Sequence, residues 1–184
     1  MKLKTTEKGL TLVELLVALS IAAFVTAAAS MTIITMMRLT PMTNNWAIAL
    51  RQVQDAGYWI SRDVMMSQTI LVDPDPVTPT FLTLTVLQPS TVLQPSPPPK
   101  TIVYQFEDMS GGLKRLMRDD DQTPGQSIMI AEYIYYDPVN DPDDSTQVTE
   151  YVSDNRTLTV RIAAVISGDE KVIRQYDATQ RVPP

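Results

Sequence analysis

The sequence contains neither cysteine nor histidine. The lack of cysteine excludes a disulfide framework, a thiol nucleophile and a zinc–thiolate site. The lack of histidine removes the commonest general base and the commonest metal ligand. Neither a Gly-rich phosphate-binding loop nor a nucleophile elbow can be found in the sequence. We therefore predict that the protein is not an enzyme, has no catalytic residues and needs no cofactor.

Positive charge is also scarce, because 15 Lys and Arg residues face 21 Asp and Glu residues. The resulting net charge of -6, with a pI near 4.6, disfavours binding to nucleic acid. Lys114, Arg115 and Arg118 form the one basic cluster of note, and no aromatic residues are interleaved with them. DNA binding is therefore the less favoured alternative.

Charge is missing altogether from one long segment near the N-terminus. The 23 residues from Leu15 to Met37 carry no charged side chain. As a helix they would span roughly 34 Å, which is enough to cross the apolar part of a bilayer. Alanine and serine recur along this segment and would allow other helices to approach closely. Basic residues before it predict an N-terminus in the cytoplasm and a C-terminal domain outside; they are Lys2, Lys4 and Lys8.

A cleavable secretory signal is the alternative interpretation of this segment. The small residues Ala27, Ala28 and Ala29 could provide its cut site. The apolar run is long for such a signal, and Glu14 lies inside its front edge. A carboxylate there costs free energy unless it has a partner. Glu14 could lie at the level of the lipid headgroups, or it could be held for a partner cation, and its position alone does not decide between the two.

A second helical pattern follows the apolar segment. Between Thr43 and Gln68, apolar residues recur at spacings of three and four, which predicts an amphipathic helix with one buried stripe. The stripe consists of Trp46, Ala49, Leu50, Val53, Ala56, Ile60 and Val64. Pro41 removes one backbone donor and should kink or interrupt the helix between the two parts.

The rest of the chain is rich in strand-forming residues. Alternating apolar and β-branched residues predict strands over 81–87, 101–106, 113–117, 128–136, 157–166 and, more weakly, 171–180. Gly111 and Gly112 predict the turn of a hairpin. Tyr133, Tyr135 and Tyr136 are expected to be half-buried sheet residues. Together the patterns predict an α+β fold in which a long N-terminal helix, membrane-spanning and then amphipathic, packs on an antiparallel β-sheet.

Two loops have distinctive compositions. Residues 88–100 hold five prolines and predict an extended, exposed loop. The second loop is acidic, and its oxygen ligands make it a weak candidate for Ca²⁺, although its spacing fits no EF-hand. The candidate ligands are Asp137, Asn140, Asp141 and Asp143.

Residues 8–19 read Lys-Gly-Leu-Thr-Leu-Val-Glu-Leu-Leu-Val-Ala-Leu. This segment resembles the N-terminal signature of type IV pilins and type II secretion pseudopilins: a glycine, an apolar residue, Thr-Leu, any residue and Glu, followed by an apolar helix. The resemblance covers residues 8 to about 37. One departure is Leu10, where phenylalanine or methionine is more usual.

The resemblance implies that a prepilin peptidase cuts between Gly9 and Leu10 and that the new amine of Leu10 is N-methylated. It also implies that Glu14 forms a salt bridge with the N-terminal amine of a neighbouring subunit during assembly. The implied partners are the prepilin peptidase, other pilin or pseudopilin subunits and an inner-membrane assembly platform. The chain would reside in the cytoplasmic membrane and then in a pilus or pseudopilus filament.

The resemblance gives the chain four parts: a cleaved leader at 1–9, a membrane and filament-core helix at 10–37, its amphipathic continuation at 38–70, and a β-rich domain at 71–184. Ile60-Ser61-Arg62-Asp63-Val64 and the hairpin around Gly111-Gly112 also resemble J-type minor pseudopilins and W-type minor pilins. These subtypes imply a minor subunit that primes assembly or lies at the filament tip. The alternative is an adhesin, displayed on a filament or anchored in the membrane, that binds a ligand through its β-domain.

Overall fold

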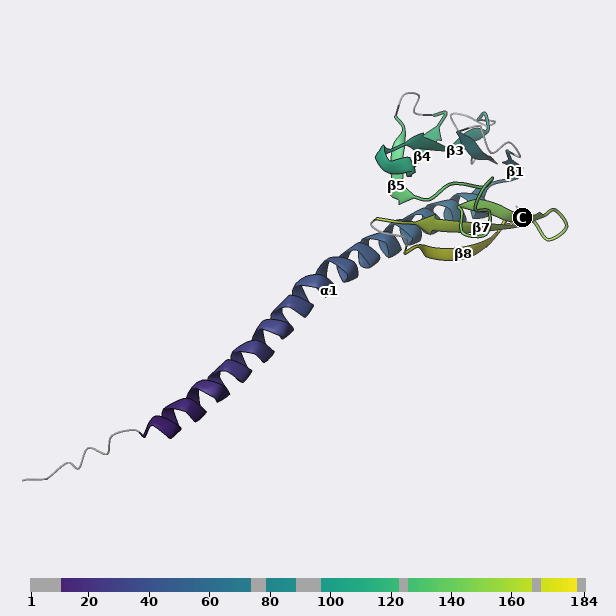
Figure 1. Cartoon of the computed structure of the whole chain (residues 1–184). Helices are drawn as coiled ribbons and strands as arrows, with labels where there is room; N and C mark the ends of the chain where they lie inside the picture. The colour runs from purple at the N-terminus through teal and green to yellow at the C-terminus, as the bar shows by residue number, and fades with distance from the viewer. Residues whose placement is uncertain (1–10, 74–78, 89–96, 123–125, 167–169, 182–184) are drawn as a thin grey trace, which may run out of the picture. The chain divides into compact units, whose positions relative to one another are not determined.

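The computed structural model describes residues 11–73, 79–88, 97–122, 126–166 and 170–181. The chain divides into two compact units, Met1–Thr43 and Asn44–Pro184. Helix α1, Leu12–Met66, contributes to both (Figure 1). The helix continues through Pro41, so the predicted interruption at this residue is wrong. Proline removes a single backbone donor, and the neighbouring bonds of the ladder suffice.

The described part of the first unit is the first half of α1. An 18-residue window of the helix reaches a mean hydropathy of 2.3, and none of that window is buried within the chain. Leu12 and Phe24 are each 79% exposed. A helix that is apolar on all sides cannot remain in water, so its surface must be covered by lipid or by other helices.

In the second unit, the last turns of α1 pack on an antiparallel sheet, to which the described residues contribute eight strands. The strands are β1 (Thr69–Val72), β2 (Thr80–Val86), β3 (Lys100–Asp108), β4 (Lys114–Asp120), β5 (Ile128–Ile134), β6 (Gln147–Val152), β7 (Thr157–Ala164) and β8 (Val172–Thr179). They pair in the order β1-β2-β3-β4-β5-β7-β6, and β8 lies on the other edge of β7. The architecture is the predicted α+β fold with an antiparallel sheet.

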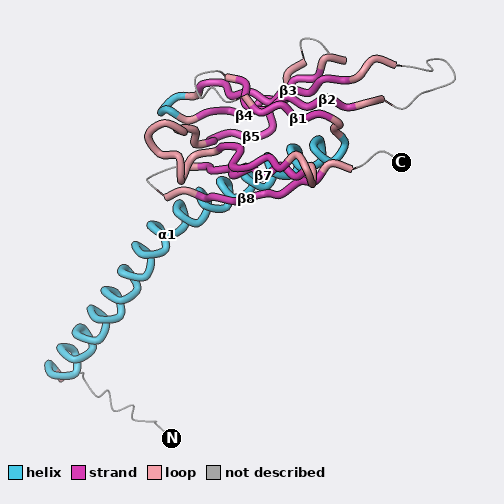
Figure 2. Tube along the Cα trace, turned by 90° about the vertical axis from the view of Figure 1, so that its right-hand side faces the viewer, coloured by secondary structure: helices cyan, strands magenta, loops and turns pink. Residues whose placement is uncertain are grey.

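The sheet curls where β5 meets β7. These two strands share a single bridge, Ile134 to Ala164, whereas β7 pairs with β8 along its whole length. Figure 2 shows the last turns of α1 running alongside β7 and β8, with β1–β5 forming the other part of the sheet. The curl gives the sheet a concave face that can cover the helix.

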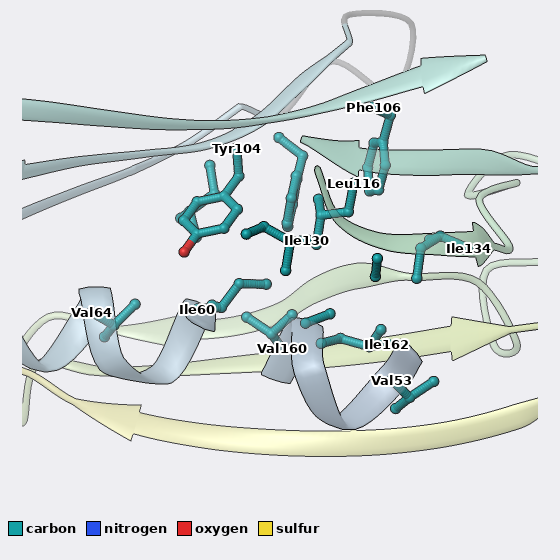
Figure 3. Packing of buried hydrophobic residues seen from close by; sticks show 14 of the residues in the cluster. Val53, Ile60, Val64, Tyr104, Phe106, Leu116, Ile130, Ile134, Val160 and Ile162 are labelled. Atoms are coloured by element: carbon teal, nitrogen blue, oxygen red, sulfur yellow. The ribbon is translucent and has the colours of Figure 1, made fainter. Parts of the chain in front are cut away.

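The core forms where the apolar stripe of α1 meets this face. Val53, Ile60 and Val64 are at most 1% exposed, and Tyr104 is fully buried. Figure 3 shows Ile60 between the helix and the strands that carry Tyr104 and Ile130. Burying a Val or Ile side chain contributes about 1.5–3 kcal/mol each, so this stripe holds the helix to the sheet.

The close approach of helix and sheet depends on Gly57. A Cβ atom at this position would lie 2.3 Å from Cζ of Tyr176 on β8. The end of the helix is also tied to the chain's C-terminal part, because the backbone N–H of Arg181 donates to the carbonyl of Met65 at 3.1 Å. The side-chain amide of Gln180 donates to Oγ of Ser67 at 3.1 Å. These bonds satisfy polar groups that a helix end leaves free.

Several predicted boundaries differ from the structure. The helix ends at Met66, and residues 69 and 70, which the prediction gave to the helix, belong to β1. The short apolar run around Ile70 fits either element, and pairing with β2 decides for the strand. Strand β6 was not predicted. Trp46 is 45% exposed and lies off the buried stripe.

Candidate functional site

The first candidate site is the start of α1, where Glu14 is bound to Thr11. The backbone N–H of Thr11 donates to Oε2 of Glu14 at 3.0 Å, and the Thr11 hydroxyl donates to the same oxygen at 2.9 Å. In return, the backbone N–H of Glu14 donates to Oγ1 of Thr11 at 3.3 Å. This is a capping box, in which Thr at the N-cap and Glu three residues later satisfy each other's backbone donors. The other oxygen of Glu14, Oε1, has no partner in the part of the chain that the structure describes.

The cleavage and N-methylation positions of the prediction, Gly9 and Leu10, lie outside the described residues. Their placement relative to Glu14 therefore stays a prediction. The capping box does place Glu14 in the first turn of the helix, directly after that segment. A negative charge in the first turn also complements the positive end of the helix dipole.

Hydroxyl groups along the apolar helix are satisfied without any partner outside it. Each serine and threonine between Leu12 and Thr43 donates to the carbonyl four residues earlier, at 2.8–3.1 Å. An unsatisfied hydroxyl costs several kcal/mol in hydrocarbon, so this bonding lets the segment enter lipid or pack against another apolar helix. The hydroxyls leave the outer surface of the helix apolar.

The acidic turn proposed for Ca²⁺ is held by protein donors. Asn140 donates from its side chain to Oδ1 of Asp137 at 3.0 Å. Asp141 accepts from the Tyr135 hydroxyl at 3.1 Å and pairs with Lys171, which lowers the pKa of the Asp141 carboxyl. Among the described residues, no three acidic groups converge as they would around a metal ion. The geometry thus gives no support to the calcium hypothesis, and Asp143 lies apart from these contacts on the exposed side of the turn.

The basic cluster on β4 is neutralised within the domain. Lys114 pairs with Asp108, and Arg115 donates to Oε1 of Glu132 at 3.1 Å. Arg118 is only 6% exposed. Side chains that are paired or buried in this way do not form a basic face, so the structure does not favour the DNA-binding alternative.

A buried polar network was missed by the sequence analysis. Nε of Arg118 donates to Oδ2 of Asp63 at 2.6 Å, and the Tyr104 hydroxyl donates to the same oxygen at 2.7 Å. Nη1 of Arg118 lies 3.6 Å from Oδ2 of Asp120, which also pairs with Lys100. The network links the last turns of α1 to β3 and β4. Only the position of Asp63 on the apolar stripe, between Ile60 and Val64, could have signalled it.

Burial and the charged partners in this network shift the pKa values of Tyr104, Arg118 and Asp120. Burial and the neighbouring carboxylate of Asp63 raise the pKa of Tyr104 far above its usual 10.0. Burial would lower the pKa of Arg118, but the bond to Asp63 more than reverses this and the pKa is raised. Burial would raise the pKa of Asp120, yet the bond from Lys100 outweighs it and the pKa is lowered. Each shift favours the neutral tyrosine and the charged arginine and aspartate, so these groups keep those protonation states near neutral pH.

Comparison with protein families gives a match, which lies near the N-terminus. Residues 4–30 match the prokaryotic N-terminal methylation motif. No curated protein and no solved structure gives a significant match to this chain. This motif is typical of type IV pilin-like precursors, which a prepilin peptidase processes and which assemble with other pilin subunits. The apolar helix fits a membrane-anchored pilin.

Proposed function

We propose that this chain is a minor pilin or pseudopilin, a structural subunit cut between Gly9 and Leu10 and assembled into a type IV pilus or a type II secretion pseudopilus. The observation that carries the proposal is an apolar helix, exposed on all sides, whose first turn holds a lone carboxylate within the N-terminal methylation motif. The β-domain would lie outside the membrane, as the basic residues at the N-terminus favour.

The assembly step follows from the surroundings of Glu14. In a bundle of apolar helices a carboxylate and a free amine are both costly, and pairing them removes much of the penalty for each. Within the described residues the capping box uses only Oε2 of Glu14, so Oε1 is available to accept a bond from the N-terminal amine of a neighbouring subunit. The pairing would set the axial register of the subunits.

The proposed role within the filament is to prime assembly or to occupy the tip. The motif Ile60–Val64 supports a J-type or W-type minor subunit, because its Asp63 joins the helix to the hairpin β3–β4 through Arg118. The hairpin and the motif that carry the resemblance are therefore parts of one buried contact. The four parts proposed for the chain remain the leader at 1–9, the filament-core helix at 10–37, its continuation at 38–70 and the β-domain at 71–184.

The test compares Glu14→Gln with Glu14→Ala in a host that makes the filament. Glutamine can keep the capping box, because its amide oxygen accepts the Thr11 bonds, but it carries no charge. Alanine removes both the cap and the charge. We expect both variants to be inserted and cut after Gly9, and both to be poorly incorporated into sheared filaments. Normal incorporation of Glu14→Gln would show that Glu14 serves only to cap its own helix.

A further inference from the structure

A groove of about 710 Å³ opens at the end of the second unit where α1 stops. It is bounded by the last turn of α1, the end of β2, the start of β3 and the residues after β8. Met66 and Leu87 line it and are 46% and 54% exposed, although both are large apolar side chains. The apolar surface of the groove is suited to an apolar side chain of another molecule.

Two exposed guanidinium groups give the groove a positive character. Arg62 and Arg181 line it, are exposed and form no ion pair with any carboxylate in the described ranges. Arg118 also lines it, but its Nε donates to Asp63 and its Nη1 lies 3.6 Å from Oδ2 of Asp120, so its charge is already offset. Among the described residues that line the groove, Asp63 alone is acidic, and it is already bound by Arg118 and Tyr104. The groove can therefore accept a carboxylate beside an apolar group.

The acidic turn Asp137–Asp144 carries both an exposed apolar residue and an exposed acidic residue. Val139 is 70% exposed at its tip, and the exposed carboxylate of Asp143 forms no ion pair with the described residues. The turn is fixed in place, since Lys171 pairs with both Asp141 and Asp144. A rigid turn loses little conformational entropy when it docks.

The turn and the groove lie at opposite ends of one strand. Lys171, which holds the turn, comes directly before β8, and Arg181, which lines the groove, lies two residues after its end. The eight residues of β8 separate the two by roughly 25 Å. A contact between unlike surfaces of two copies leaves a free groove on one copy and a free turn on the other, so further copies can be added.

We propose that two copies of this chain stack head to tail, with Val139 and Asp143 of one copy seated in the groove of the next, against Leu87, Arg62 and Arg181. The proposal rests on the proposed function, to which it adds how a minor subunit begins a filament. A nucleic acid would fit the groove poorly, because its repeated phosphates would meet the acidic surface of a chain of net charge -6. A single carboxylate next to an apolar side chain avoids that repulsion.

Cysteine cross-linking in the full chain tests the contact without background, because the chain has no cysteine of its own. Two differently tagged copies, one Leu87→Cys and one Val139→Cys, are produced together in membranes and mildly oxidised. We expect a disulfide between the unlike copies and none between like copies. Leu71→Cys replaces Leu87→Cys as the control, because Leu71 is 60% exposed but lies outside the groove.

A charge exchange tests the polar half of the contact. Arg181→Glu in the copy with Leu87→Cys should lower the cross-link yield roughly five- to tenfold, since an attraction becomes a repulsion. Asp143→Lys in the copy with Val139→Cys should do the same, and the two substitutions together should restore the yield. Both side chains are exposed, so neither change disturbs the core.

The outcomes separate this proposal from the proposed function. A chain that is cut after Gly9 and enters filaments, but cross-links equally through Leu71 and Leu87 or not at all, overturns the head-to-tail contact alone. Cross-linking of the Leu87→Cys copy only to a different protein also overturns it. A specific cross-link in a chain that is never cut would support the contact and contradict the proposed function.

Discussion

Replacing Asp63 by asparagine should destabilise the β-domain far more than the same replacement of Asp55 on the same helix. Asp63 is 1% exposed and accepts bonds from Arg118 and Tyr104. Asp55 faces Arg51 at 3.6 Å, with side chains 50% and 80% exposed. The two substitutions remove the same charge from the same element, so only the surroundings differ.

The expected magnitudes follow from burial. Asp63→Asn leaves the guanidinium of Arg118 buried, with only the more distant Asp120 to offset it, which should cost about 3–5 kcal/mol. Asp55→Asn removes an exposed ion pair and should cost about 0–1 kcal/mol. Replacing the whole set by Asp63→Leu, Tyr104→Phe and Arg118→Met removes the charges together with their partners. That triple variant should lose less stability than Asp63→Asn alone.

The assay is urea unfolding of the full chain in detergent, followed by the fluorescence of Trp59 in a Trp46→Phe background. The ring of Trp59 lies 5.6 Å from Cζ of Arg118, so its emission should report on the network. Equal shifts of the unfolding midpoint for Asp55→Asn and Asp63→Asn would refute the reasoning. A triple variant less stable than Asp63→Asn would refute the account of the buried charge.

Three further predictions use the same unfolding measurement. Gly57→Ala should lower the free energy of unfolding by about 1–3 kcal/mol, because its Cβ would meet the ring of Tyr176. Adding Tyr176→Ala to this variant should recover part of the lost stability, and no recovery would contradict the clash. The pKa of Asp120 is lowered from 3.8, so its ionised form stabilises the folded protein above that pH, and this stability is lost as the pH falls through the folded pKa. Asp120→Asn should therefore reduce the loss of stability between about pH 5 and 3. An unchanged dependence of stability on pH would count against this role of Asp120. Gly111→Ala should cost about 1 kcal/mol through its φ of 80° alone, whereas Ser110→Ala should change little; equal effects would argue against backbone strain.

The strands that the sequence predicted best are those with one buried face. In β7, Leu158, Val160 and Ile162 alternate with more exposed residues, as their pattern indicated. Strand β6 was missed because few of its side chains are buried and it lies at an edge, so alternation in its sequence is weak. Residues 171–180, predicted only weakly, form β8 because they pair with the whole of β7.

Local sequence patterns also limit which candidate sites can be predicted. Thr11 and Glu14 are three residues apart, and the capping box could have been found from that spacing alone. Asp63 and Arg118 are 55 residues apart, and only the fold shows that they meet. The groove also combines side chains from α1, β2, β3 and the residues after β8, and no local pattern reveals such a surface.

The central claim, that this chain is a processed filament subunit, is tested most directly by the mass of its N-terminal peptide. The protein would be recovered from membranes of a host with and without its prepilin peptidase. We predict a peptide that begins at Leu10 and carries one added methyl group, found only when the peptidase is present. An uncut chain in both hosts, or a cut near Ala29, would contradict the account and favour a membrane-anchored or secreted β-rich domain.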